Sequence, residues 1–379
     1  MITRDLVEAF AFSTPVICAV ICMLMMLMDA YTCKQNVQER RLRLYLAVIY
    51  LVTALGWLGM VLYAVSPAGY IYYHTVFLLA LMLDQVMFYR FVALLTDTGR
   101  SRKFNRLHIA IPLAVAAFSA GCDLFVPAEK QMAVVYGDAS LTSDTWFGIV
   151  YILTSIVFIV YNTLYPLLSL RNIRRYRRFV VDYSSEAQRT SLDWLFGIQL
   201  LIFVCIPVPL AGILLGIDTF SSSWFVWLGA LPYSVLYIIL CYNMLDDNYL
   251  IVQPDAADGE DASDGEYVTE KEAAIDRKQF ERYLREKKPY LNARLRITDL
   301  AADLNTNRNY LSAFINREYD MNFSRLINRC RLAELDKLRN SSRYDGKSNM
   351  ELVLKAGFGN YRNYLRVKKE EYKRSLLKV

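Results

Sequence analysis

Six polar residues in the stretch 297–317 have side chains that can read nucleic acid. They are Asn307, Arg308, Asn309, Ser312, Asn316 and Arg317. Asparagine and arginine hydrogen-bond the edges of bases in the major groove of DNA, and arginine and serine also bind phosphates. The chemistry that these residue types predict is therefore the recognition of double-stranded DNA.

Two short helices joined by a tight turn would position these side chains. Leu300, Ala301 and Leu304 recur at helical spacing in the first helix, and Leu311 and Phe314 do so in the second. Each helix thus has one apolar face, which leaves the six polar residues on the outside of the second helix. The stretch predicts a helix-turn-helix, although an αα-hairpin in some other small helical domain would have the same pattern.

Residues at the expected helix ends agree with this prediction. Thr298 is expected to cap the first helix and Asn307 the second, because short polar side chains accept hydrogen bonds from free N–H groups at helix N-termini. Asn305 lies between the two helices, and asparagine adopts the left-handed backbone conformation more readily than most residues.

A second unit of the same kind is predicted near the C-terminus, after a long amphipathic helix over 323–338. Ser348 and Glu351 have the spacing of a capping box, the helix that they begin ends at Gly357, and Asn360 begins the next helix. Two units joined rigidly can enter successive segments of the major groove. The polar residues of the last helix are Asn360, Tyr361, Arg362, Arg366, Lys368 and Lys369.

The charge of this region points to a polyanionic partner. From Tyr267 onward the chain has 26 Lys and Arg against 15 Asp and Glu, which is a net charge of +11. Such an excess is typical of nucleic-acid-binding domains. Non-specific attraction to anionic lipid is the alternative.

The two units resemble the DNA-binding domain of the AraC/XylS family of bacterial transcription regulators. The second half departs from the family pattern at Val353, at Lys368 and in the last residues of the chain. The resemblance implies sequence-specific DNA binding, with RNA polymerase as a further partner. It is carried by PYLN at 289–292, ITDLAADLNTNRNYLSAFINREYDMNFSRLINRCRLAEL at 297–335 and AGFGNYRNYLRVKK at 356–369.

The N-terminal part of the chain predicts a membrane protein. The chain has 379 residues, of which 55% are hydrophobic, and few soluble domains reach that share. Seven apolar segments are long enough to cross a bilayer, which takes about 20 residues of helix. Residues 1–250 are therefore expected to form a seven-span bundle. The spans lie at 10–30, 44–65, 71–95, 107–126, 146–170, 194–216 and 224–245.

The loops between these spans predict an orientation. The first, third and fifth loops hold fourteen Lys and Arg, whereas the alternate loops hold only Lys130. Positively charged loops remain in the cytoplasm. We therefore expect the N-terminus outside and the C-terminus in the cytoplasm, and the family resemblance implies a bacterial inner membrane.

Asp84 falls near the middle of the third span, where a carboxylate cannot reach water. A structural hydrogen bond to another helix, through Gln199 or Asn243, and a role in sensing an intramembrane ligand are both open. A retinal Schiff base is excluded because no predicted span contains a lysine, and a single deep carboxylate argues against an ion transporter.

Residues 251–276 are expected to be a flexible tether. The part 253–266 has six acidic residues and no basic one, and its Gly, Ala and Ser content is typical of disordered segments. A solvated spacer before a helical domain at 277–379 is the simpler interpretation. The alternative is an acidic segment that competes with DNA for this basic domain.

The chain is thus expected to be all-α, with a seven-helix membrane bundle and a soluble domain of two helix-turn-helix units. The expected function is that of a membrane-anchored transcription regulator. Its partners would be DNA, the lipid bilayer, a second copy of the chain, and a small-molecule or protein signal. No catalytic residue, cofactor or metal is expected, since the chain has two histidines and its seven cysteines form no CxxC pair. A receptor or transporter whose basic tail binds a protein is the alternative.

Overall fold

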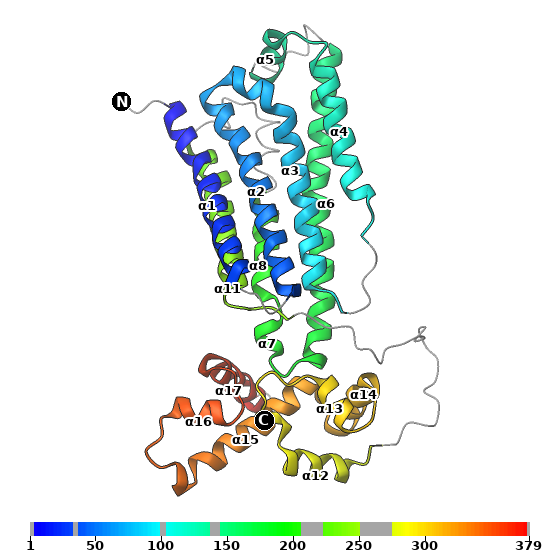
Figure 1. Cartoon of the computed structure of the whole chain (residues 1–379), viewed down its shortest axis with the longest axis vertical. Coiled ribbons are helices and arrows are strands. Elements are labelled where there is room, and N and C mark those ends of the chain that lie inside the picture. Colours follow the sequence, from blue (N-terminus) through cyan, green and yellow to red (C-terminus); the bar gives the residue numbers. More distant parts are fainter. Residues whose placement is uncertain are drawn as a thin grey trace. The chain divides into compact units, whose positions relative to one another are not determined.

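The computed structural model describes residues 4–32, 37–98, 104–136, 145–205, 223–250 and 275–376. The regular elements in these ranges are all helical (Figure 1). Two compact units divide them. The N-terminal unit takes most of the described residues up to Ile173 together with Asp193–Asn248. The C-terminal unit takes Arg174–Leu192 together with the described residues from Tyr249 onward.

Five helices are long and apolar enough to cross a membrane, and six are if one bent pair counts as a single span. The predicted first, second, third, fifth and seventh spans fall within these five helices. The last residues of α6, from Arg174, belong to the C-terminal unit. The five helices are α1 (Arg4–Thr32), α2 (Val37–Val65), α3 (Pro67–Leu95), α6 (Thr145–Tyr183) and α11 (Ser223–Leu245).

The fourth predicted span differs from expectation, and the sixth is described only in part. The fourth is α4 (Leu107–Asp123), which has only 17 residues, and α5 (Ala128–Tyr136) follows it at an angle of 119°. Pro127 lies at the break. A proline ring clashes with the residue before it in the helical conformation, so helices usually end there. The sixth begins as α8 (Asp193–Cys205), and the rest of the predicted span lies outside the described residues.

Glycines allow close helix packing in the N-terminal unit. α2 packs against both α1 and α3. A Cβ atom on Gly56 would lie 2.6 Å from the Leu81 side chain, and one on Gly59 would lie 2.5 Å from Phe77. Small residues at such contacts let helix backbones approach closely, which is a common device in membrane bundles.

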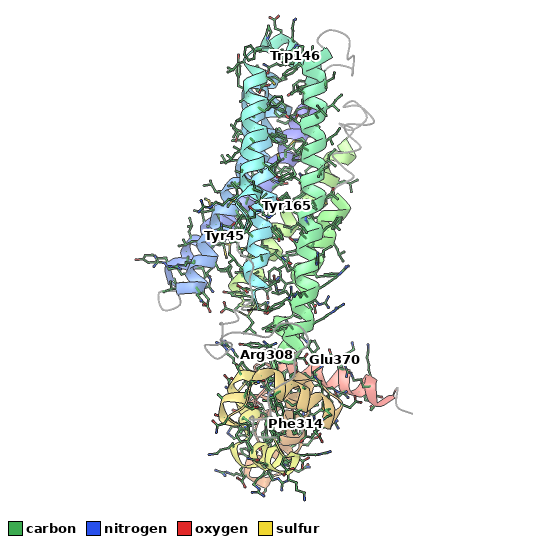
Figure 2. All side chains as sticks on the ribbon, turned by 90° about the vertical axis from the view of Figure 1, so that its right-hand side faces the viewer. Tyr45, Trp146, Tyr165, Arg308, Phe314 and Glu370 are labelled. Carbon is green, nitrogen blue, oxygen red and sulfur yellow. The ribbon has the colours of Figure 1, made fainter. Side chains whose placement is uncertain are left out.

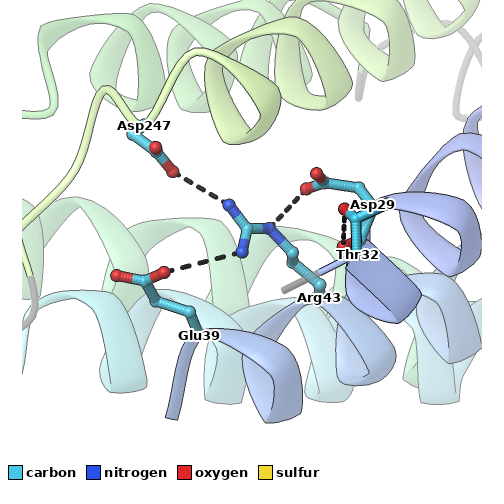
Figure 3. A network of polar contacts seen from close by, with 5 residues as sticks. All are labelled: Asp29, Thr32, Glu39, Arg43 and Asp247. Atoms are coloured by element: carbon cyan, nitrogen blue, oxygen red, sulfur yellow. Dashed lines mark hydrogen bonds and ion pairs between the residues drawn. The ribbon is translucent and has the colours of Figure 1, made fainter. Parts of the chain in front are cut away.

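Arg43 joins three elements at one end of this unit (Figure 3). Its guanidinium forms ion pairs with Asp29 on α1 at 2.5 Å, with Glu39 on α2 at 3.6 Å, and with Asp247 after α11 at 2.9 Å. The arginine is buried, so these carboxylates replace the water that its charge would otherwise require. Arg43 is one of the loop arginines that predict orientation, and it also holds the ends of these elements together.

The C-terminal unit has two hydrophobic clusters, one at each end of one long helix. The expected helix over 323–338 is confirmed as α15 (Phe323–Arg339), with Ile327 in the first cluster and Leu335 in the second. The remaining helices are α7 (Ala187–Thr190), α12 (Arg277–Lys287), η1 (Pro289–Leu291), α13 (Ile297–Asp303), α14 (Arg308–Tyr319), η2 (Ser342–Tyr344), α16 (Asn349–Lys355) and α17 (Tyr361–Leu376).

The expected tether lies almost wholly outside the described residues, and α12 begins the helical part that follows at Arg277. The segment Arg174–Leu192, which was expected only as a cytoplasmic loop of the bundle, is instead part of the C-terminal unit. Tyr183 belongs to the first cluster of that unit, and Phe179 packs against it.

Candidate nucleic-acid interface

The helices α13 and α14, here called the first helix pair, are joined as expected by a tight turn. Asn305 has a left-handed backbone with φ of 51°, and the Asn307 side chain caps α14 by accepting from Tyr310 N at 2.7 Å. Both predictions are confirmed. The prediction that Thr298 caps α13 is wrong. Arg296 is the N-cap residue, and its N–H donates to the Asp299 carboxylate at 2.8 Å.

The first helix pair buries its apolar face and exposes its polar one. Leu300, Ala301, Leu311 and Phe314 are buried in the first cluster, as the spacing predicts. Most of the side chains expected to contact DNA lie on the opposite side of α14. Those of Asn307, Asn309, Asn316 and Arg317 are exposed, and those of Arg308 and Ser312 are half-buried.

Arg308 is half-buried because aromatic rings from the end of α6 lie against it. Its guanidinium carbon is 4.2 Å from the centre of the Phe179 ring and 5.6 Å from that of Tyr183. Asp182 is near enough for its charge to interact with that of Arg308. Figure 2 labels Arg308 on the face of the C-terminal unit where α6 ends. These contacts hold the first cation of α14 away from bulk solvent.

The helices α16 and α17, the second helix pair, repeat this construction. Ser348 and Glu351 form the predicted capping box, with Glu351 N donating to Ser348 Oγ at 3.2 Å and Ser348 N donating to the Glu351 carboxylate at 3.3 Å. Gly357 is left-handed, with φ of 94°. Asn360 caps α17 by accepting from Asn363 N at 2.7 Å.

The outer face of α17 is basic. As in the first pair, some of its predicted contact residues are half-buried and the others are exposed. Asn360 and Tyr361 are half-buried, and the Tyr361 hydroxyl accepts a hydrogen bond from Asn349 at 3.1 Å. The exposed residues are Arg362, Arg366, Lys368 and Lys369. This helix thus presents cations, whereas α14 presents mainly amides.

Arg331, on α15, is the largest fully buried side chain of the unit. Its guanidinium donates to the carbonyl oxygens of Tyr290 at 2.8 Å and Asn292 at 2.7 Å, and to Ser185 Oγ at 3.0 Å. Burial lowers the pKa of Arg331 to about 10, and the nearby Glu186 charge partly offsets this effect. The side chain therefore remains charged at neutral pH, held by carbonyls in the protein interior.

The backbone of Ser184 and Ser185 fills the space around this arginine. Ser184 forms an isolated antiparallel bridge with Arg296, and Ser185 N donates to Leu295 O at 3.1 Å. The Ser185 carbonyl in turn accepts from Asn328 at 3.2 Å. We call residues Ser184–Glu186 the docked segment. It is in contact with α15 and with the residues just before α13.

Glu186 completes the docked segment beside the second helix pair. It is buried, and a Cβ atom on Gly359 would overlap its carboxylate. Sequence reasoning missed this segment, because its short polar residues have no periodicity and its partners lie far along the chain. The apolar Phe179, Val180 and Tyr183, directly after an arginine-rich run, were the only available signal.

A buried acid on α15 ties this helix to η1. Glu334 accepts from Lys288 Nζ at 2.6 Å and from the Tyr290 hydroxyl at 3.2 Å. Burial alone would raise the pKa of Glu334, but the hydrogen bonds and charge of Lys288 and Tyr290 outweigh it and lower this pKa. The carboxylate therefore remains ionised. It holds Tyr290, whose carbonyl oxygen binds Arg331.

The polar residues singled out within the spans do not form one site. Asp84 accepts a hydrogen bond from Thr53 on α2 at 2.5 Å, so its partner is neither Gln199 nor Asn243. Asn243 donates to Ile239 O, and the buried Gln199 amide has no hydrogen-bond partner among the described residues. The cavity beside Asp84 measures about 20 Å³, which is room for a water molecule but not for an organic ligand. This geometry favours the structural interpretation of Asp84.

No family model matches the chain, and neither a curated protein nor a solved structure gave a match. What the chain does must therefore be inferred from its own residues and their geometry.

Proposed function

We propose that the chain is a membrane-anchored transcription regulator that binds DNA sequence-specifically through its C-terminal unit. The two helix pairs would act as helix-turn-helix units of the AraC/XylS type, with α14 and α17 as the helices that enter the major groove. The observation that carries the proposal is the outer face of α14. Its exposed Asn309 and Asn316 lie on the second helix of a tightly joined pair, and the exposed Asn307 is the N-cap residue of that helix.

The two helix pairs would have different roles in this regulator. The amides on α14 suit the reading of bases, whereas the Arg and Lys side chains on α17 suit phosphates. Binding through many cations releases counterions, so affinity should fall steeply as the salt concentration rises. The net charge of +11 from Tyr267 onward supports this reading.

The N-terminal unit would anchor the regulator in a bacterial inner membrane through seven spans, with the N-terminus outside. The arginine-rich loops support this orientation. A small-molecule or protein signal received by the bundle would change DNA binding in the cytoplasm. Pairing of two chains would raise the local concentration of their DNA-binding units, and RNA polymerase would be the partner of the bound protein.

The proposal is tested with the full chain in detergent or nanodiscs, because Arg174–Leu192 is part of the C-terminal unit. Duplexes enriched from a random-sequence library are expected to share one motif and to be retarded at moderate salt. A parallel experiment maps the DNA that the tagged chain binds across a bacterial genome. If the chain retards all duplexes to the same extent, or retards none of them, sequence-specific binding is refuted.

A second candidate function is favoured by the surface of the second helix pair. Its large apolar side chains at Met350, Leu354, Leu365 and Tyr372 are exposed. Met350 and Leu354 lie one turn apart on α16, and exposed apolar patches are typical of protein-binding sites. In this alternative the chain is a receptor or transporter whose basic tail binds a protein, and it would show no motif in the selection experiment.

A further inference from the structure

We propose that the end of α6 is an autoinhibitory cover on the first helix pair. Phe179 would cover the Arg308 guanidinium and must move off it before α14 can bind DNA, while the buried Tyr183 anchors this end of α6 in the first hydrophobic cluster. This inference rests on the proposed DNA-binding function, and it adds a means by which that function is switched off within one chain.

The first argument is the position of the two rings. The Phe179 ring lies 4.2 Å from the Arg308 guanidinium carbon, well within the range of a cation–π interaction. Tyr183 lies on the same cation at 5.6 Å. Asn307 and Asn309, on either side of Arg308 in the sequence, are exposed. The cover thus lies on the one cation at the start of α14.

The second argument is that the cover is built into the domain. Tyr183 is 1% exposed and belongs to the first hydrophobic cluster. The docked segment follows it directly, held by the bridge from Ser184 to Arg296 and by the hydrogen bond from Arg331 to Ser185 Oγ. A surface contact made by chance would not be anchored by a buried ring and by hydrogen bonds to the interior of the domain.

The third argument is steric. A helix that reads DNA places its N-terminal residues against base edges, with little space around them. In this structure the Phe179 and Tyr183 rings at the end of α6 lie against Arg308, the first residue of α14. The Phe179 ring thus takes up space beside this guanidinium that an approaching duplex would need.

The decisive variant is Phe179→Leu, which keeps an apolar side chain at this half-buried position and removes the ring. Its affinity for a selected duplex should exceed that of the unaltered chain by about three- to thirty-fold, the equivalent of one cation–π interaction. The measurement is fluorescence anisotropy of a labelled duplex titrated with the full chain in nanodiscs. Duplexes are selected separately with the unaltered chain and with the Phe179→Leu variant, so that inhibition in the unaltered chain does not hide the motif.

Three matched variants identify the cause. Phe179→Trp keeps an aromatic ring over Arg308 and should bind like the unaltered chain. Phe158→Leu makes the same chemical change elsewhere on α6 and should also leave affinity unchanged. In an Arg308→Ala background, Phe179→Leu should give no gain, because the ring acts through the arginine that is now missing.

The outcomes separate the two proposals. If neither the unaltered chain nor the Phe179→Leu variant enriches a motif, the proposed function fails. If a motif is enriched and Phe179→Leu binds it no more tightly than the unaltered chain, the cover is refuted while the function stands. A gain that persists in the Arg308→Ala background would also refute the cover. A gain that is lost in that background, together with unchanged binding by Phe179→Trp, supports it.

Discussion

The two helix pairs of the C-terminal unit share one construction and differ in how crowded their turns are. α13 and α16 each have seven residues. Each ends in two backbone hydrogen bonds that close the last turn, from Asn305 and Thr306 in the first pair and from Gly357 and Phe358 in the second. This pattern is the Schellman motif, in which a left-handed residue ends the helix.

The left-handed residue is Asn305 in one pair and Gly357 in the other, and the surroundings explain the difference. A Cβ atom on Gly357 would overlap the Tyr290 carbonyl and lie 2.7 Å from Leu291 Cα. A side chain is accommodated at Asn305, where the residue is exposed. The same local motif therefore tolerates a side chain in the first pair and excludes one where η1 passes close by.

The largest expected effect on this comparison comes from Gly357→Ala. Backbone strain and the clash with η1 should together lower the stability of the second pair by about 3 kcal/mol. Hydrogen exchange of α16, measured by mass spectrometry on the full chain, reports this change. Gly346→Ala is the matched control. Its φ is also positive, at 81°, but no atom lies within 4 Å of the added Cβ, so only about 1–2 kcal/mol of strain is expected. Equal losses at both glycines would show that η1 does not crowd the turn.

The next effect concerns DNA. Arg308→Ala should weaken binding to a selected duplex by about 1–3 kcal/mol and change binding to random duplex little, if this arginine reads a base. Arg362→Ala in the second pair should instead weaken binding to both duplexes alike and reduce the salt dependence. Titrations at two salt concentrations measure both quantities. The same pattern for both variants would remove the proposed difference in roles.

A smaller effect is expected at the helix caps, where the two pairs are alike. Asn307→Ala and Asn360→Ala each remove a side-chain acceptor 2.7 Å from a backbone N–H. Each should destabilise its helix by about 1 kcal/mol. Faster exchange is expected in the first turns of α14 and α17 respectively, while Ser312→Ala, at a position inside α14 with no capping role, leaves both unchanged. A loss confined to one pair would contradict their equivalence.

The smallest effect is expected from Asn305→Gly. Glycine relieves the left-handed conformation but adds entropy to the unfolded chain, so the net change should stay within about 0.5 kcal/mol. The exchange rates of α13 should therefore remain close to those of the unaltered chain. A destabilisation as large as that expected for Gly357→Ala would mean that the Asn305 side chain has a role of its own.

Local rules account for what could be predicted from the sequence. The caps at Asn307 and Ser348, the left-handed Asn305 and the buried faces of α13 to α15 depend on neighbours within a few residues. The misplaced start of α13 is of the same kind, since Asp299 captures the Arg296 N–H and moves the cap away from Thr298. Such errors displace a boundary and leave the element itself intact.

The contacts that could not be predicted join residues far apart in the chain. From the sequence, Arg331 is one basic residue among many and would be expected at the surface. It is instead fully buried, and its partner Ser185 is 146 residues away along the chain. The docked segment has neither hydrophobic periodicity nor a motif. Its role depends on a surface that exists only when α13, α15 and the residues between them have folded, so no local pattern indicates it.

The distance between Ser185 and Arg331 along the chain also has a consequence for synthesis. A ribosome adds about 5–20 residues per second, so some 7–30 s pass between the emergence of these two residues. Throughout that time Tyr183 and the docked segment lack the core into which they pack in the finished protein. A nascent chain arrested before Arg331 should therefore expose Phe179 and Tyr183 to protease, and one released after Leu376 should protect them.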